Sequence, residues 1–163
     1  MQNQSLLGIA IASCLLLNQT HSNPQSIRGE TPIPSVSFEV LGPGGKPVIL
    51  PTKIVPINTN STVLSVSIDA LKASHLDFET GGSGTDTYIT SIAGLSQQDN
   101  GPLSGWIYKV NNTFPPEAPA AYMVQPGDLI TWVYTNDLGK DVGAPLVIRQ
   151  SHTNKVSINN MRF

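Results

Sequence analysis

The sequence predicts a single small α+β domain that is built from short strands and one helix. The chain has 163 residues, which suits one domain. Only 12% of the residues are charged, while the chain holds 16 Ser, 13 Thr, 12 Asn, 8 Gln, 14 Gly and 13 Pro. After the first thirty residues, apolar side chains fall in short alternating runs, and one stretch between them has helical spacing.

The same composition excludes several classes of protein. A net charge of -2 leaves no basic surplus to follow a phosphate backbone, so we do not expect a nucleic-acid binder. A coiled coil would need far more Glu, Lys and Leu, and 39% hydrophobic residues in patterned runs do not fit disorder. What remains is a turn-rich domain with little charge, a composition that is common outside the cytoplasm.

Residues 1–22 predict an export signal. The apolar stretch Leu6–Leu17 has the length of a signal-peptide core and is shorter than the roughly 20 residues that span a bilayer. Within it, Ile11-Ala12-Ser13-Cys14 resembles a bacterial lipobox, in which the Cys14 thiol is acylated and anchors the mature protein to a membrane. A cleaved signal that contains a cysteine, and no export at all, are the alternatives. Cys14 is the single cysteine, so no intramolecular disulfide is possible.

A linker is predicted at residues 23–34, because three prolines there break any regular element. The domain is expected at residues 35–149. Residues 150–163 are expected to form a tail or one late strand.

The first two strands follow the linker. Val36–Val40 alternates apolar and polar residues, as a half-buried strand does. After a Gly-Pro-Gly-Gly turn, residues 48–57 return as an extended segment. Pro51 and Pro56 cannot donate ladder hydrogen bonds, so this segment is expected at a sheet edge.

One helix is predicted over residues 61–74, after the capping side chains of Asn60-Ser61-Thr62. The apolar residues Leu64, Ile68 and Leu71 are spaced by four and then three positions, which is helical. A strand alternation also fits part of this segment. His75 would be a solvated residue at the helix end. The side chains expected to face mostly solvent are Ser65, Ser67, Asp69 and Lys72.

The remaining strands are expected after this helix, and turns separate them. The glycine-rich turn Gly81–Gly84 lacks the Lys-Ser/Thr ending of a phosphate loop. Gln125–Asp128 is a second turn, with Pro and Gly at adjacent positions. The predicted strands are Leu76–Phe78, Thr87–Ile92, Gly105–Asn111, Tyr122–Val124 and Leu129–Tyr134.

Two of these strands concentrate the aromatic area of the chain. Period two places Trp106 and Tyr108 on one face of their strand, and Trp132 and Tyr134 on one face of theirs. One interpretation is that these rings build the core of a small β domain. The other is that they form an amphipathic wall for a flat ligand or a partner surface.

These strands carry a resemblance to a known family. The segments Gly105–Asn111, Tyr122, Pro126–Asp128 and Ile130–Tyr134 resemble the transcobalamin-like carboxy-terminal domain of vitamin B12 carriers, which recurs as an exported bacterial module. Thr62-Val63-Leu64, Tyr88–Gly94 and Asp137-Leu138-Gly139 also fit, and the best match runs over residues 57–143.

The resemblance implies a β-grasp-like fold, with one helix packed on a twisted, mixed sheet. It implies an extracellular or surface-anchored binding module without enzymatic activity. Cobalamin or a related corrinoid would be a transported ligand, no cofactor is firmly implied, and a transporter or surface protein is the expected partner. The expected ligand contacts are Trp106, Tyr108, Trp132 and Tyr134, with Asn111 and Phe114 at the rim.

A surface assembly protein is the alternative function, either an adhesin module or a fibre subunit that adds strands between subunits. An enzyme is not expected, because no acidic pair has acid–base spacing and no nucleophile elbow is present. Asp99-Asn100-Gly101, and Asn136-Asp137 with Asp141, offer oxygens for Ca²⁺ but lack the spacing of an EF-hand, so no metal site is predicted.

Overall fold

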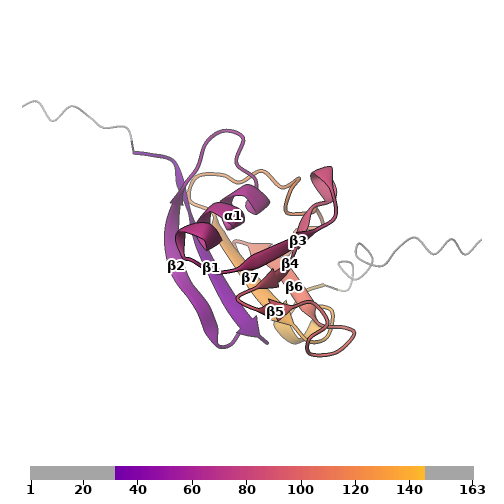
Figure 1. Ribbon diagram of the computed structural model, residues 1–163. Helices are drawn as coiled ribbons and strands as arrows, with labels where there is room; N and C mark the ends of the chain where they lie inside the picture. The colour runs from indigo at the N-terminus through magenta and orange to yellow at the C-terminus, as the bar shows by residue number, and fades with distance from the viewer. Residues whose placement is uncertain (1–31, 146–163) are drawn as a thin grey trace, which may run out of the picture. The chain divides into compact units, whose positions relative to one another are not determined.

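The computed structural model describes residues 32–145 (Figure 1). Cys14, the predicted export signal and the predicted tail lie outside the described residues, as does most of the predicted linker. The described chain forms a four-stranded sheet, a three-stranded sheet and one α-helix. The prediction of an α+β fold is therefore confirmed.

The larger sheet has the strand order β2-β1-β7-β6. β1 and β7 run parallel and the other neighbours run antiparallel, so the sheet is mixed. β2 lies at an edge, as its prolines predict. The four strands are β1 (Ser35–Pro43), β2 (Val48–Pro56), β6 (Gly105–Val110) and β7 (Leu129–Thr135).

One face of this sheet is covered and forms the core. Along β1 the alternating residues Val36, Phe38 and Val40 are almost completely buried, while the residues between them are half-buried. β6 shows the same alternation, and β7 is buried at nearly every position. The period-two pattern of the sequence therefore identified the face that carries the core.

The helix α1 (Val63–Ala73) is confirmed over the strand alternative. Thr62 and Ser65 form a capping box at its start. The amides of Val63 and Leu64, which have no acceptor within the helix, donate to main-chain carbonyls of the segment 119–122. After the C-cap, exposed His75 has a φ of 54°, the left-handed conformation in which helices commonly end.

The prediction that Ser67 faces solvent is wrong. Ser67 is completely buried, and its hydroxyl donates to the Val63 carbonyl at 2.6 Å. The same oxygen accepts the indole N–H of Trp132 at 2.7 Å, which joins α1 to the centre of the sheet. The other three predicted solvent-facing side chains of the helix, at positions 65, 69 and 72, are exposed.

A second, smaller sheet lies beside α1 and covers the β6 end of the large sheet (Figure 1). Its order is β3-β4-β5, with β3 (Phe78–Gly81), β4 (Tyr88–Ile92) and β5 (Leu95–Ser96). Short 3-10 turns lie at η1 (Gly84–Asp86) and η2 (Lys140–Val142).

Three features of the structure after the helix differ from the sequence-based predictions. The strand expected at Leu76–Phe78 begins only at Phe78, because the helix termination uses residues 74–76. The two-residue strand β5 was not predicted. Tyr122–Val124 is not a strand, since its main chain bonds to residues 61–63 and completes the helix start instead.

No helix within residues 32–145 is long and apolar enough to cross a membrane.

We expect Ser67→Ala to destabilise the fold, because it leaves the buried Trp132 indole N–H without an acceptor. An orphaned buried donor costs about 1–3 kcal/mol. Urea denaturation should show this loss in the free energy of unfolding. Ser83→Ala, at an exposed turn where the side chain makes no cap hydrogen bond, is the matched control and should change little. Equal stability of the two variants would contradict the role of Ser67.

Candidate functional site

The four predicted aromatic residues face one another across two neighbouring strands. Trp106 is paired with Tyr134, and Tyr108 with Trp132, in the register of β6 and β7. The first pair meets edge to face, with ring centroids 5.2 Å apart and planes at 76°. The second is tilted by 41° at 5.6 Å. Such aromatic pairs stabilise a sheet beyond the area that they bury.

Each ring also binds, through its polar atom, an element that packs against the large sheet. The Trp106 indole N–H donates to the Leu95 carbonyl at 2.8 Å, and the Tyr134 hydroxyl donates to the Ser96 carbonyl at 2.7 Å, so both bind β5. The Tyr108 hydroxyl donates to the Glu117 carbonyl at 2.8 Å. Together with the bond from the Trp132 indole to α1, these contacts tie the helix, β5 and the loop after β6 to one aromatic layer.

The structure places these four rings inside the core. Trp132 is 1% exposed and Tyr134 is 0% exposed, while Trp106 and Tyr108 are each 6% exposed. This burial supports the interpretation that the rings build the core. No observation tests ligand contact by these residues, which stays a prediction. In this conformation the rings present almost no surface to a ligand.

Burial of Tyr108 also has an electrostatic consequence. Two effects raise the pKa of the Tyr108 hydroxyl far above its usual value. The larger is burial away from solvent, and the smaller is the nearby charge of Glu117. The hydroxyl is therefore a permanent hydrogen-bond donor to the Glu117 carbonyl and does not act as a base. This arrangement is structural and gives Tyr108 no acid–base chemistry near neutral pH.

The predicted rim residues lie where β6 ends and β7 begins. Asn111 and Asn112 have φ of 49° and 66°, and reciprocal bonds between Val110 and Thr113 close a two-residue turn around them. Phe114 follows this turn and is half-buried. Asparagine tolerates positive φ well, so the Asn-Asn pair was a turn signal in the sequence.

Asn111 is fixed by a small polar network. Its amide donates to the Asp128 carboxylate at 2.7 Å and its side-chain oxygen accepts the Leu129 N–H at 2.9 Å. The other Asp128 oxygen accepts the Gln125 N–H at 2.8 Å, which confirms the predicted turn. Sequence reasoning placed Asp128 in a turn but missed its contact with Asn111.

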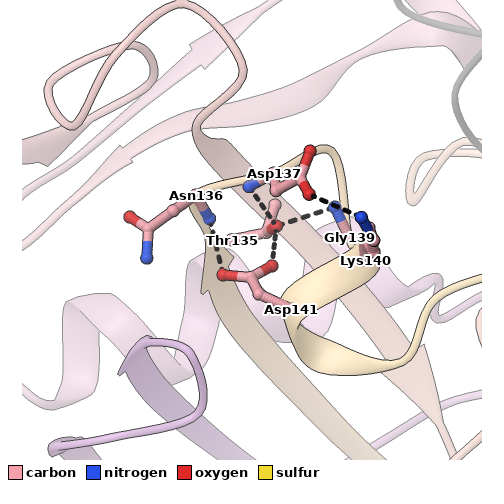
Figure 2. Close-up of polar contacts among 6 residues, drawn as sticks. All are labelled: Thr135, Asn136, Asp137, Gly139, Lys140 and Asp141. Atoms are coloured by element: carbon pink, nitrogen blue, oxygen red, sulfur yellow. Dashed lines mark hydrogen bonds and ion pairs between the residues drawn. The ribbon is translucent and has the colours of Figure 1, made fainter.

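The opposite end of the two strands carries a second polar cluster, shown in Figure 2. The Asp141 carboxylate accepts hydrogen bonds from the Thr135 hydroxyl and, at 2.8 Å, from the Asn136 N–H. The Thr135 hydroxyl oxygen accepts the Gly139 N–H at 2.7 Å. These contacts fold the chain back on itself after β7.

The two segments considered for Ca²⁺ meet here. The Asn100 amide donates to the Asn136 side-chain oxygen at 2.9 Å, and Asp137 forms an exposed ion pair with Lys140 at 3.8 Å. Protein donors already occupy the Asp141 oxygens. Across residues 32–145, no group of three or more His, Cys, Asp or Glu side chains is placed to hold a metal ion.

Exposed apolar side chains accompany this second cluster. Leu103 is 46% exposed and Leu138 is 38% exposed, and the Leu138 N–H donates to the Leu103 carbonyl at 2.9 Å. Both belong to loops, and periodicity reports on strands and helices, so the sequence pattern gave no signal for this pair.

Comparison with known proteins finds a family match in sequence and similarities in fold. Residues 60–136 match a family described as "Domain of unknown function (DUF4430)". No curated protein matches the sequence. The structure is similar to haptocorrin in complex with Cbi, with a TM-score of 0.54 and 22% identity, over 64% of this chain and 25% of the haptocorrin chain. The chain thus spans about a quarter of that protein.

A second solved structure is less similar. It is a protein of Ruminococcus gnavus ATCC 29149 described as a candidate metal-binding protein, with a TM-score of 0.41 and 15% identity over 62% of this chain and 95% of that one. The likeness to haptocorrin agrees in fold with the transcobalamin-like resemblance of the sequence.

Stability should depend on pH through Asp141. Partial burial works against its charged form, but bonds from the Thr135 hydroxyl and from neighbouring backbone amides dominate and lower the pKa below 3.8. A lowered folded-state pKa stabilises the fold above the unfolded-state value, and the contribution is lost as the pH falls through the folded-state pKa.

We therefore expect Asp141→Asn to be less stable than the natural chain near pH 6, and the difference to shrink as the pH falls below about 4. Thermal denaturation across this range measures it. Asp86→Asn, at an exposed turn, is the control and should show a smaller change. A difference that grows on acidification would contradict the assignment.

Proposed function

We propose that this domain is a non-enzymatic binding module that acts outside the cytoplasm and takes a corrinoid, such as cobalamin or cobinamide. The observation that carries the proposal is the likeness in fold to part of haptocorrin, a protein solved in complex with Cbi. The transcobalamin-like motifs of β6 and β7 support it. Anchoring through a lipid on Cys14 belongs to the same proposal.

The proposed contact surface is the rim at the Asn111-Asn112 turn, where β6 ends and β7 begins. Asn111 is exposed and held by Asp128 and Leu129, so its turn is a fixed polar edge. Half-buried Phe114 offers apolar area beside it in the chain. A corrinoid combines an apolar macrocycle with peripheral amides, which suits such a mixed surface. The buried rings of β6 and β7 would then support the rim from below.

One domain of this size would cover one side of so large a ligand. The structural match covers 25% of the haptocorrin chain. We therefore propose that the domain binds a corrinoid weakly alone and that a transporter or another surface protein supplies the second face.

Titration with cobinamide, followed by its visible absorption, tests this proposal. We expect measurable binding that Phe114→Ala weakens about tenfold, since such a loss corresponds to about 1.4 kcal/mol of lost contact. Leu103→Ala, at the opposite end of the strands, is the control and should bind as the natural chain does. No binding up to millimolar cobinamide would overturn the corrinoid proposal.

The second candidate is assembly by strand addition at β2, and one observation favours it. Register and the bond from the Ile57 N–H to the Pro34 carbonyl place the main-chain groups of Ile54 on the open edge, and its side chain is 69% exposed. Pro51 and Pro56 limit this edge to a short ladder.

Light scattering over a concentration series distinguishes the two candidates. A particle mass that rises with concentration, and stops rising in Ile54→Pro, would favour assembly. A strictly monomeric particle would argue against it.

A further inference from the structure

The loop between β5 and β6 contains the only Asn-Gly pair of the chain, Asn100-Gly101. Asn100 is exposed, and a Cβ placed on Gly101 would meet no atom within 4 Å, so the space around this pair is open. Gly101 has a φ of 109°, which favours glycine. Because glycine has no side chain, its main-chain nitrogen approaches the side-chain carbon of a preceding asparagine with little hindrance. The pair is therefore suited to an attack within the chain.

This attack leads to deamidation, and its atoms balance with water as the single co-reactant. The Gly101 nitrogen bonds to the Asn100 Cγ while the bond from Cγ to the side-chain nitrogen breaks. That nitrogen leaves as ammonia and carries the proton of the Gly101 amide. Water then opens the five-membered succinimide ring at one of its two carbonyl carbons, and the ring nitrogen regains a proton. The product is an aspartate or an isoaspartate, each with a new carboxylate.

Hydrogen bonds in the structure engage both reacting groups. The Gly101 N–H donates to the Gln98 carbonyl at 3.0 Å, so the nucleophile is held in a turn. The Asn100 side-chain amide donates to the Asn136 side-chain oxygen at 2.9 Å, so the group under attack is held as well. The Asn100 N–H also donates to the Ser104 hydroxyl oxygen at 3.1 Å. The attack therefore requires this loop to open locally, and the bonds that close the loop set the rate.

Asn136 restrains the pair from outside the loop. It follows β7 and lies 36 positions from Asn100 in the sequence. Its main-chain N–H is bound to Asp141 at 2.8 Å, and its side chain points away from that carboxylate (Figure 2). The Asn136 side-chain oxygen therefore holds Asn100 from a fixed part of the chain. Because this bond is exposed, water competes for both groups and the bond opens readily.

We propose that Asn100 is a site of spontaneous deamidation and that its bond to Asn136 limits the rate. The loop thus carries a slow, irreversible modification that needs no enzyme. The product replaces the amide donor of Asn100 with a carboxylate, so the bond to the Asn136 oxygen is lost. It also places a negative charge next to Asp99, at an end of the domain that already carries Asp137 and Asp141. Like charges repel, so the modification weakens the contact between this loop and the segment after β7.

Mass spectrometry of the full chain during storage in mildly alkaline buffer tests this proposal. Trypsin releases residues 73–109, in which Asn100 is the only asparagine, and residues 110–140, which contain three other asparagines. We expect peptide 73–109 to gain the mass of deamidation first. In Asn136→Ala it should do so about fivefold faster, because a fivefold change corresponds to about 1 kcal/mol, the typical contribution of one hydrogen bond. Asn60→Ala, in the exposed turn before α1, is the matched control and should keep the natural rate.

Ser67→Ala separates this local bond from a general loss of stability. It destabilises the fold without touching the loop, so it should leave the rate at Asn100 unchanged. Two results would overturn the proposal. One is a peptide 73–109 that stays unmodified in the natural chain and in Asn136→Ala, while a synthetic peptide of residues 97–104 is deamidated in the same buffer. The other is a rate in Asn136→Ala that is no higher than in the natural chain or in Ser67→Ala.

Discussion

The hydrogen bond from the Trp132 indole to the Ser67 hydroxyl is the contact on which the rest of the structure depends. It joins the centre of the large sheet to the middle of α1, where both groups are almost completely buried. A small domain gains much of its core from aromatic area, but each Trp and Tyr brings a polar atom that must be paired. Here every such atom on β6 and β7 finds its partner in the second layer, so one set of rings both fills the core and positions the elements around it.

Much of the fold followed from the sequence because it rests on local signals. Period two identified the buried faces of β1 and β6, the spacing of Leu64, Ile68 and Leu71 identified the helix, and proline identified the edge strand β2. The failures share a physical cause. Ser67 looked like a solvent-facing helix residue because its partner, Trp132, lies 65 positions away. Tyr122–Val124 looked like a strand because local pattern does not report that its main chain completes the helix start.

The candidate site was also predicted only in part, because local patterns do not show contacts between residues far apart in the sequence. Asn111 and Phe114 lie at a strand end, where the sequence placed them, but the Asp128 carboxylate that fixes Asn111 is 17 positions away. The four rings had two interpretations, as the core of the domain or as a wall for a ligand, and their burial leaves them little surface for contact. In this conformation a binding function therefore uses surface other than these rings, such as the strand ends and loops that the aromatic layer holds in place. This division between a rigid core and exposed ends is common in small binding domains.

The central claim is that the aromatic layer is closed to solvent and hydrogen-bonded within the protein. Exchange of the two tryptophan indole N–H protons with deuterium, followed by NMR in the native protein, tests it most directly. The account predicts slow exchange for both protons, and slower exchange for Trp132, which bonds to the helix, than for Trp106, which bonds to the short strand β5. Rapid exchange of both would contradict the account, because it would show that the rings face solvent and are free to contact a ligand.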